Sequence, residues 1–217
     1  MRLTQEQAIW FNRVHEEWFE VMRPFVDGFQ IGPVFPPLPR LPPERLRHCL
    51  LLPSREDLLH HLPKGGICAE IGTQEGVFAE KIWQITQPKQ LHLFDLYDTW
   101  LRPALREQPG VTLHLGDSST NLAAFPDDHF NWIYIDGDHS YEGVKRDIEV
   151  ARSRVKPGGL LIFNDFTIWS PAECCDYGVA YAVCEFIEED GWNVAFFALH
   201  PHLYNDVALH RPWSRQK

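Results

Sequence analysis

Apolar residues in the first part of the chain recur at helical spacing, and those in the later part form short, strand-like runs. Over residues 4–25 apolar positions return every three or four residues, which predicts one amphipathic helix. The residues of this stripe are Trp10, Val14, Trp18, Val21 and Phe25. Thr4 and Gln7 have capping-box spacing at its start. The stripe is typical of a helix that packs on its own chain, and a helical lid or a dimer contact is the alternative.

Residues 32–43 contain six prolines in twelve positions. Such a stretch suits neither a helix nor a central strand, so it predicts an extended connector, with a PxxP partner site as the alternative. Ser54 then stands where it can cap a short helix that ends near Leu62.

From Gly66 onward, strand-like and helix-like segments alternate. Strands are predicted at residues 67–71, 90–95, 111–115, 131–136, 159–164, 192–199 and 203–210. Helices are predicted at about residues 75–86, 99–107, 119–124, 141–155 and 178–190. This order predicts an α/β fold with a mostly parallel sheet and helices on both faces. The last two strands are too close in sequence for a parallel crossover, so they are predicted to form an antiparallel hairpin.

Composition narrows the class of protein. The chain has 217 residues, 44% of them hydrophobic, and a net charge of −10. An acidic surface argues against a nucleic-acid partner. We see no apolar run of about 18 residues and no signal peptide, so no membrane partner is expected. The five cysteines are odd in number and lack metal-finger spacing, which favours reduced thiols and a cytoplasmic location.

Polar side chains, most of them acidic, follow five successive predicted strands. They are Glu70, then Asp95, then Asp117 with Ser118, then Asp136 with Asp138 and His139, and finally Asn164 with Asp165. Ligands of parallel sheets bind at the carboxyl ends of the strands. The sequence therefore predicts a ligand site with an acidic rim, which favours a ligand that carries positive charge.

The turn after the first of these strands is rich in glycine. Residues 66–76 read GICAEIGTQEG, with Glu70, Gly72 and Gly76 in the spacing E-x-G-x-x-x-G. This is neither the dinucleotide fingerprint nor a phosphate-binding loop, and no lysine follows to meet a phosphate. Glycines let a ligand approach the backbone. A nucleoside ligand with a cationic group fits this turn better than a pyrophosphate does.

Two further carboxylates suit a nucleoside. Asp95 lies 19 residues beyond Gly76, where a carboxylate can take both hydroxyls of a ribose. Asp117 and Ser118 follow the third strand, where a carboxylate can accept from an adenine amine. The alternatives are a turn aspartate at residue 95 and a helix N-cap at residue 117.

Five segments occur in the order seen in class I S-adenosylmethionine-dependent methyltransferases, which the chain resembles over about residues 64–210. They are GICAEIGTQEG, LHLFDLYD, HLGDSS, IYIDGDHSYEGVKRDIEV and VKPGGLLIFNDF. IDGDHSYEGVKRDI also resembles a subgroup of small-molecule O-methyltransferases. The resemblance implies a seven-stranded, Rossmann-like sheet with an antiparallel last strand. It implies a catalytic domain over residues 64–217 and leaves residues 1–63 as a helical extension.

The resemblance also implies roles for the strand ends. The methionine part of the cofactor would lie at the glycine turn, the ribose at Asp95 and the adenine at Asp117 and Ser118. The cofactor-binding residues it implies are Glu70, Gly72, Thr73, Gly76, Asp95, Asp117, Ser118 and Asp136.

Methyl transfer to a hydroxyl needs a base or a metal ion to help remove the proton. Asp136, Asn164 and Asp165 offer three hard oxygen ligands of the kind Mg²⁺ prefers, and some related O-methyltransferases bind a divalent ion there. The middle ligand is often acidic in those relatives, whereas Asn164 is neutral. His139, with Asp136, is the predicted catalytic base. The alternatives are that Asp136 only lines the cofactor pocket, Asp165 caps a loop and His139 is structural.

The function predicted is therefore methyl transfer from S-adenosylmethionine to a small-molecule acceptor, at a hydroxyl oxygen, with or without Mg²⁺. The loop at residues 166–177 could close over the acceptor. Candidate acceptor contacts are Tyr141, Phe166, Trp169 and Tyr177. The alternatives are a catalytically inactive cofactor-binding scaffold, which neutral Asn164 keeps open, and an NAD-dependent oxidoreductase, which Glu70 and the glycine spacing disfavour.

Overall fold

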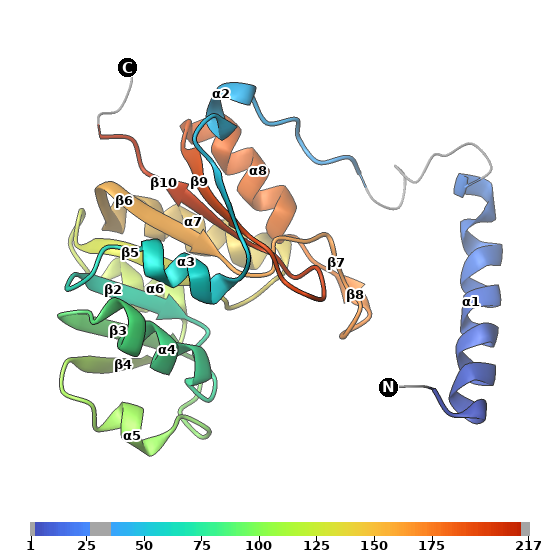
Figure 1. The fold of residues 1–217 in the computed structure, drawn as a ribbon, viewed down its shortest axis with the longest axis horizontal. Helices are drawn as coiled ribbons and strands as arrows, with labels where there is room; N and C mark the ends of the chain where they lie inside the picture. Colours follow the sequence, from blue (N-terminus) through green and yellow to red (C-terminus); the bar gives the residue numbers. More distant parts are fainter. Residues whose placement is uncertain (1–2, 27–35, 214–217) are drawn as a thin grey trace. The chain divides into compact units, whose positions relative to one another are not determined.

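The computed structural model describes residues 3–26 and 36–213, and the chain divides into two units, Met1–Leu38 and Pro39–Lys217 (Figure 1). The sequence placed the boundary near residue 63. That boundary stays a prediction, and the segment just before it packs onto the sheet, where Leu58 and Leu59 are fully buried.

The first unit contains helix α1, Gln5–Val26, as predicted. Its capping box is formed: the amide of Thr4 donates to Gln7 Oε1 at 2.9 Å, and the amide of Gln7 donates to Thr4 Oγ1 at 3.2 Å. The predicted packing stripe is largely exposed, with Trp10 at 58% and Trp18 at 46%. A dimer contact through this stripe stays a prediction. The side chain of Phe25 and residues 32–35 of the predicted connector lie outside the described residues.

The second unit is built on an eight-stranded sheet with the order β1-β9-β10-β6-β5-β2-β3-β4. All pairs are parallel except those of β10, which runs antiparallel to both β6 and β9. The predicted hairpin is thus confirmed. The strands are β1 Leu50–Leu52, β2 Ile67–Ile71, β3 Gln90–Asp95, β4 Val111–Leu115, β5 Phe130–Ile135, β6 Val155–Phe163, β9 Asn193–Ala198 and β10 Asp206–His210.

The resemblance implied seven strands, and β1 adds an eighth by pairing with β9. Its three residues are too few to give an alternating pattern. A separate two-stranded hairpin, β7 Trp169–Ser170 and β8 Cys175–Asp176, lies inside the loop predicted to cover the acceptor.

Helices cover both faces of the sheet (Figure 1). They are α2 Pro43–Leu46, α3 Arg55–His61, α4 Val77–Thr86, α5 Pro103–Arg106, α6 Ser118–Ala123, α7 Tyr141–Arg154 and α8 Val179–Asp190. One core lies between the sheet and α6, α7 and α8, and the other between the sheet and α3, α4 and α5. Alternation along β5 sends Ile133 and Ile135 to the first core, and Trp132 and Tyr134 to the second.

Ser54 caps α3 as predicted, because its side chain accepts from the amide of Asp57 at 3.1 Å. In the described part of the chain, no helix combines the length and the apolar character needed to cross a bilayer.

Candidate active site

A cavity of about 430 Å³ opens at the carboxyl edge of the sheet, beside the ends of β2, β3, β4 and β5. Five of the eight predicted cofactor residues line it: Gly72, Asp95, Asp117, Ser118 and Asp136. Glu70, Thr73 and Gly76 do not. The structure therefore gathers most of the predicted set around one space large enough for a nucleoside.

Gly72 lets the ends of β2 and β5 approach each other. It has φ +85°, and a Cβ there would lie 1.9 Å from the carbonyl oxygen of Asp136. Only glycine fits that position without a backbone shift. Gly76 also has positive φ, but its missing Cβ faces the side chains of Leu101 and Leu105. Its role in this structure is packing at the start of α4.

Asp95 ends β3 with a carboxylate that is held by two backbone amides. Oδ2 accepts from Gln74 at 2.7 Å, and Oδ1 accepts from Tyr97 at 3.1 Å. These bonds fix the carboxylate at the wall of the cavity, so it is preorganised for a ligand.

Asp117 and Ser118 lie at the start of α6. Asp117 is the N-cap that the alternative reading described: it accepts from the amide of Thr120 at 2.7 Å, and this bond lowers the pKa of its carboxyl group. Ser118 donates to Asp147 at 2.7 Å. Asp147 lines the cavity, and burial raises its pKa to about 6. Asp147 was missed because it lies within α7, twelve residues beyond the end of β5.

Glu70 is only 1% exposed, and its Oε2 forms no hydrogen bond with the residues that the structure describes. Burial, followed by the nearby charge of Asp136, raises the pKa of Glu70 well above its ordinary value. A buried oxygen without a partner is costly, so it suits a hydrogen-bond donor brought by a ligand.

His139 lies between two carboxylates. Its Nε2 is 3.5 Å from Asp136 Oδ1 and 3.7 Å from Asp165 Oδ2. These are ion-pair contacts rather than hydrogen bonds, and Nε2 forms no hydrogen bond with any described residue. The ring stacks on Tyr177 with centroids 4.7 Å apart. Burial lowers the pKa of His139, but the two carboxylates outweigh burial and the net shift is upward. Burial raises the pKa of Asp165 to about 6.

Arg55, at the start of α3, reaches the same carboxylates and was missed by the sequence analysis. Its guanidinium lies 3.8 Å from Asp136 Oδ2 and packs over the ring of Phe78, 4.2 Å from the centroid. In the sequence, Arg55 is marked only by its position just after the capping serine. That position does not indicate which strand the side chain would contact.

Asp206, at the start of β10, was also missed. It is 1% exposed and accepts hydrogen bonds from the Tyr134 hydroxyl and, at 3.1 Å, from Asn164 Nδ2. Burial raises its pKa to about 7. Asn164 is itself buried and bound to this pair, so its amide nitrogen is committed to structure.

The predicted metal ligands are close together but do not form an open set of oxygens. Asp136 is paired with Arg55, Asp165 with His139, and Asn164 with Asp206. Among residues 3–26 and 36–213, no group of three or more His, Cys, Asp or Glu side chains is arranged to hold a metal ion.

Of the predicted acceptor contacts, Tyr177 is the one that meets the catalytic candidates, through its stacking on His139. Tyr141 instead donates to Glu185 at 2.6 Å, and Phe166 packs edge-on against Phe197. Trp169 lies in β7.

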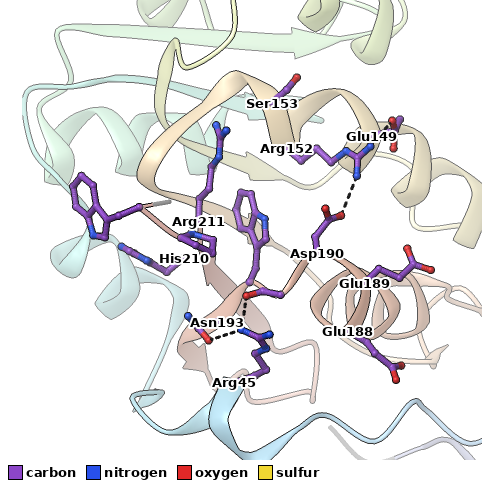
Figure 2. A pocket seen from close by; sticks show the side chains of 14 residues that line it. Arg45, Glu149, Arg152, Ser153, Glu188, Glu189, Asp190, Asn193, His210 and Arg211 are labelled. Atoms are coloured by element: carbon purple, nitrogen blue, oxygen red, sulfur yellow. Dashed lines mark hydrogen bonds and ion pairs between the residues drawn. The ribbon is translucent and has the colours of Figure 1, made fainter. Parts of the chain in front are cut away.

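A second, larger cavity of about 930 Å³ opens at the opposite edge of the sheet (Figure 2). Its arginines are already occupied. Arg152 pairs with Asp190 at 3.0 Å, and Arg45 donates to the carbonyl of Gly191 at 2.6 Å. Arg211 pairs with Asp128 at 2.6 Å. This cavity offers no convergent set of unpaired groups, so the carboxyl edge is the better candidate site.

Comparison with known proteins gives one family match. Residues 69–166 match the family described as a methyltransferase domain. None of the curated proteins compared with the chain matches it.

Solved structures share the fold at low identity. An S-adenosylmethionine-dependent methyltransferase from Mesorhizobium loti is 16% identical, with a TM-score of 0.53 over 71% of this chain and 96% of that one. A protein from Corynebacterium glutamicum is 17% identical, with a TM-score of 0.59 over 97% and 100%. An O-methyltransferase family protein from Burkholderia thailandensis is 14% identical, with a TM-score of 0.55 over 73% and 55%. The family model covers residues 69–166, and the solved structures show that the fold is shared.

Proposed function

We propose that the protein transfers the methyl group of S-adenosylmethionine to a hydroxyl oxygen of a small molecule. The observation that carries this proposal is the position of His139, a base candidate held between Asp136 and Asp165. Asp136 also lines the 430 Å³ cavity, so the base stands beside the space that the cofactor would fill.

The residues around that cavity suit the cofactor. Gly72 lines the cavity, and Glu70, which lies next to lining residue Ile71, has a buried oxygen without a partner among the described residues that would accept from the ammonium group. Asp95 would hold the ribose, and Asp117 with Ser118 would meet the adenine. When bound, S-adenosylmethionine supplies an electrophilic methyl group on a sulfonium, so donor activation needs little from the protein.

The acceptor hydroxyl must lose its proton as the methyl group arrives. His139 Nε2 would take that proton, and the two carboxylates would stabilise the imidazolium that forms. Stacking on Tyr177 fixes the plane of the ring. Because the pKa of His139 is raised, we expect turnover to fall as the pH drops through that pKa, since the protonated ring cannot act as a base.

Magnesium assistance stays a prediction, and the contacts of the predicted ligands disfavour it. The oxygens of Asp136 and Asp165 already face Arg55 and His139, the amide nitrogen of Asn164 donates to Asp206, and Asn164 adds no charge. We therefore assign no step of the reaction to a metal ion.

The first test is calorimetric titration with S-adenosylhomocysteine. We expect micromolar binding by the wild type and by His139→Ala, because His139 does not line the cofactor cavity. Absence of binding to the wild type would refute the proposal.

The second test addresses the acceptor. The protein and S-adenosylmethionine would be incubated with a panel of hydroxylated small molecules, and methyl gain would be followed by mass spectrometry. We expect an O-methyl product with the wild type and none with His139→Ala. Binding of S-adenosylhomocysteine without transfer to any hydroxyl would instead favour the inactive scaffold.

A further inference from the structure

Two carboxylates at the candidate site, Asp136 and Asp165, face one arginine and one histidine. Arg55 Nη1 lies 3.8 Å from Asp136 Oδ2, while His139 Nε2 lies 3.5 Å from Asp136 Oδ1 and 3.7 Å from Asp165 Oδ2. We define Asp136 and Asp165 as the carboxylate pair. Side chains of the same protein therefore lie where they can balance its negative charge.

Arg55 is held firmly in this position. It begins α3, whose first turn is capped by Ser54 and whose inner face is anchored by fully buried Leu58 and Leu59. Its guanidinium rests on the ring of Phe78. A side chain that is already ordered gives up little further entropy when it pairs with a carboxylate.

Arginine is a permanent cation, because its guanidinium does not lose its proton in proteins. A divalent ion bound to Asp136 would stand within a few ångströms of that charge, and like charges repel strongly where water is scarce. Asn164, between the pair in sequence, adds no negative charge to offset the repulsion. The carboxylate pair is therefore a poor metal site as long as Arg55 is present.

We propose that Arg55 is a positioning residue that replaces a divalent cation at this site: it orients and neutralises Asp136, so the protein works without a metal ion. That the protein works without a metal ion in catalysis rests on the proposed methyl transfer. That Arg55 neutralises Asp136 does not, because it concerns only Arg55 and the carboxylate pair.

The test is calorimetric titration with Mn²⁺, a spectroscopically convenient ion with the ligand preferences of Mg²⁺. Three full-length proteins would be compared: the wild type, Arg55→Met and Arg102→Met. Arg102 pairs with Glu80 at 2.7 Å, away from the carboxylate pair, so its variant changes the net charge equally. Electron paramagnetic resonance of Mn²⁺ would report the same binding independently.

We expect the wild type and Arg102→Met to bind Mn²⁺ no more tightly than about millimolar, and Arg55→Met to bind it at least about tenfold more tightly. Adding Asp136→Asn to Arg55→Met should abolish the gain. Micromolar binding of Mn²⁺ by the wild type would overturn the proposal. So would an Arg55→Met variant that gains nothing, provided that it still melts cooperatively.

Titration with S-adenosylhomocysteine in EDTA and in Mn²⁺ separates this proposal from the proposed function. Equal affinity in both solutions is expected. If the wild type does not bind S-adenosylhomocysteine at all, the methyltransferase proposal fails, while the Mn²⁺ result still decides the role of Arg55. If Arg55→Met does not fold, the wild-type Mn²⁺ affinity remains a direct test.

Discussion

Replacing His92 with phenylalanine should remove part of the loss of stability that the protein shows in mild acid. His92 lies on β3, is 9% exposed, and packs edge-on against Phe125 and Phe130 with ring centroids 5.0 and 5.6 Å away. Its Nδ1 is 2.9 Å from His114 Nε2, so one ring must be a neutral acceptor. Burial, followed by the charges of His114 and His129, lowers the pKa of His92 from 6.5 to about 4.

The sign of the effect follows from this pKa. Between pH 6.5 and pH 4 the unfolded chain binds a proton at His92 and the folded chain does not. The free energy of unfolding therefore falls as the pH falls through this window. From pH 7.5 to pH 5 the loss from this one residue amounts to about 2 kcal/mol. Below pH 4 it reaches about 3 kcal/mol, the full difference between the two pKa values.

Urea unfolding at pH 7.5, 6 and 5, followed by tryptophan fluorescence, gives the free energy of unfolding of the wild type and of His92→Phe. The variant loses a hydrogen bond to His114, so it should be less stable than the wild type at pH 7.5. The gap should then close by about 2 kcal/mol at pH 5. Titrating groups that do not interact with His92 are common to both proteins and cancel in the difference, whereas His114 and His129, which interact with it, contribute to the measured change. Exposed His202 offers the control, His202→Phe. Parallel stability curves for the wild type and His92→Phe would refute the reasoning.

Three further outcomes are expected. Asp206→Asn should make the free energy of unfolding, measured in urea, less dependent on pH between 4 and 7. Because the pKa of Asp206 is raised to about 7 in the folded protein, this residue stabilises the fold at low pH, and that stability is lost as the pH rises through this window. Asp95→Ala should weaken S-adenosylhomocysteine binding by more than about tenfold in calorimetry, because hydrogen bonds to a carboxylate contribute about 1.5–3 kcal/mol each; unchanged affinity would remove Asp95 from the ligand site. Ser54→Ala should cost about 1 kcal/mol in thermal unfolding through loss of the α3 cap, and an unchanged melting temperature would contradict that role.

Much of the fold follows from local patterns. Strands β2 to β5 lie within one residue of their predicted positions because each is a short, mainly apolar run bounded by turn residues, whereas β6 begins at Val155, four residues before the prediction. The acidic rim was predicted because parallel strands end at one edge, and Asp95, Asp117 and Asp136 do line one cavity there. Gly76 shows the limit of motif reasoning, since its positive φ serves packing against Leu105 and not the cavity.

Asp206 and Arg55 could not be predicted in this way. Asp206 stands at the start of its strand, whereas the site residues were predicted from the carboxyl ends of strands. In an antiparallel strand the amino end lies at the same edge as the carboxyl ends of its parallel neighbours, so the direction of β10 brings Asp206 to Asn164. Arg55 belongs to a short helix outside every recognised segment. Its contact with Asp136 depends on how α3 packs on the sheet, which no local pattern encodes.

These two residues change how the charge of the site should be understood. The sequence alone describes an edge crowded with carboxylates that only a cation from solution could balance. In the structure, burial raises the pKa of Glu70 and of Asp206, so protonation removes part of that charge. Arg55 and His139 meet the charge of Asp136, and His139 that of Asp165. Groups of the chain itself therefore balance part of the negative charge of this edge with no bound ion. A positively charged cofactor would then be held by individual placed groups, such as Asp95, rather than by an excess of negative charge.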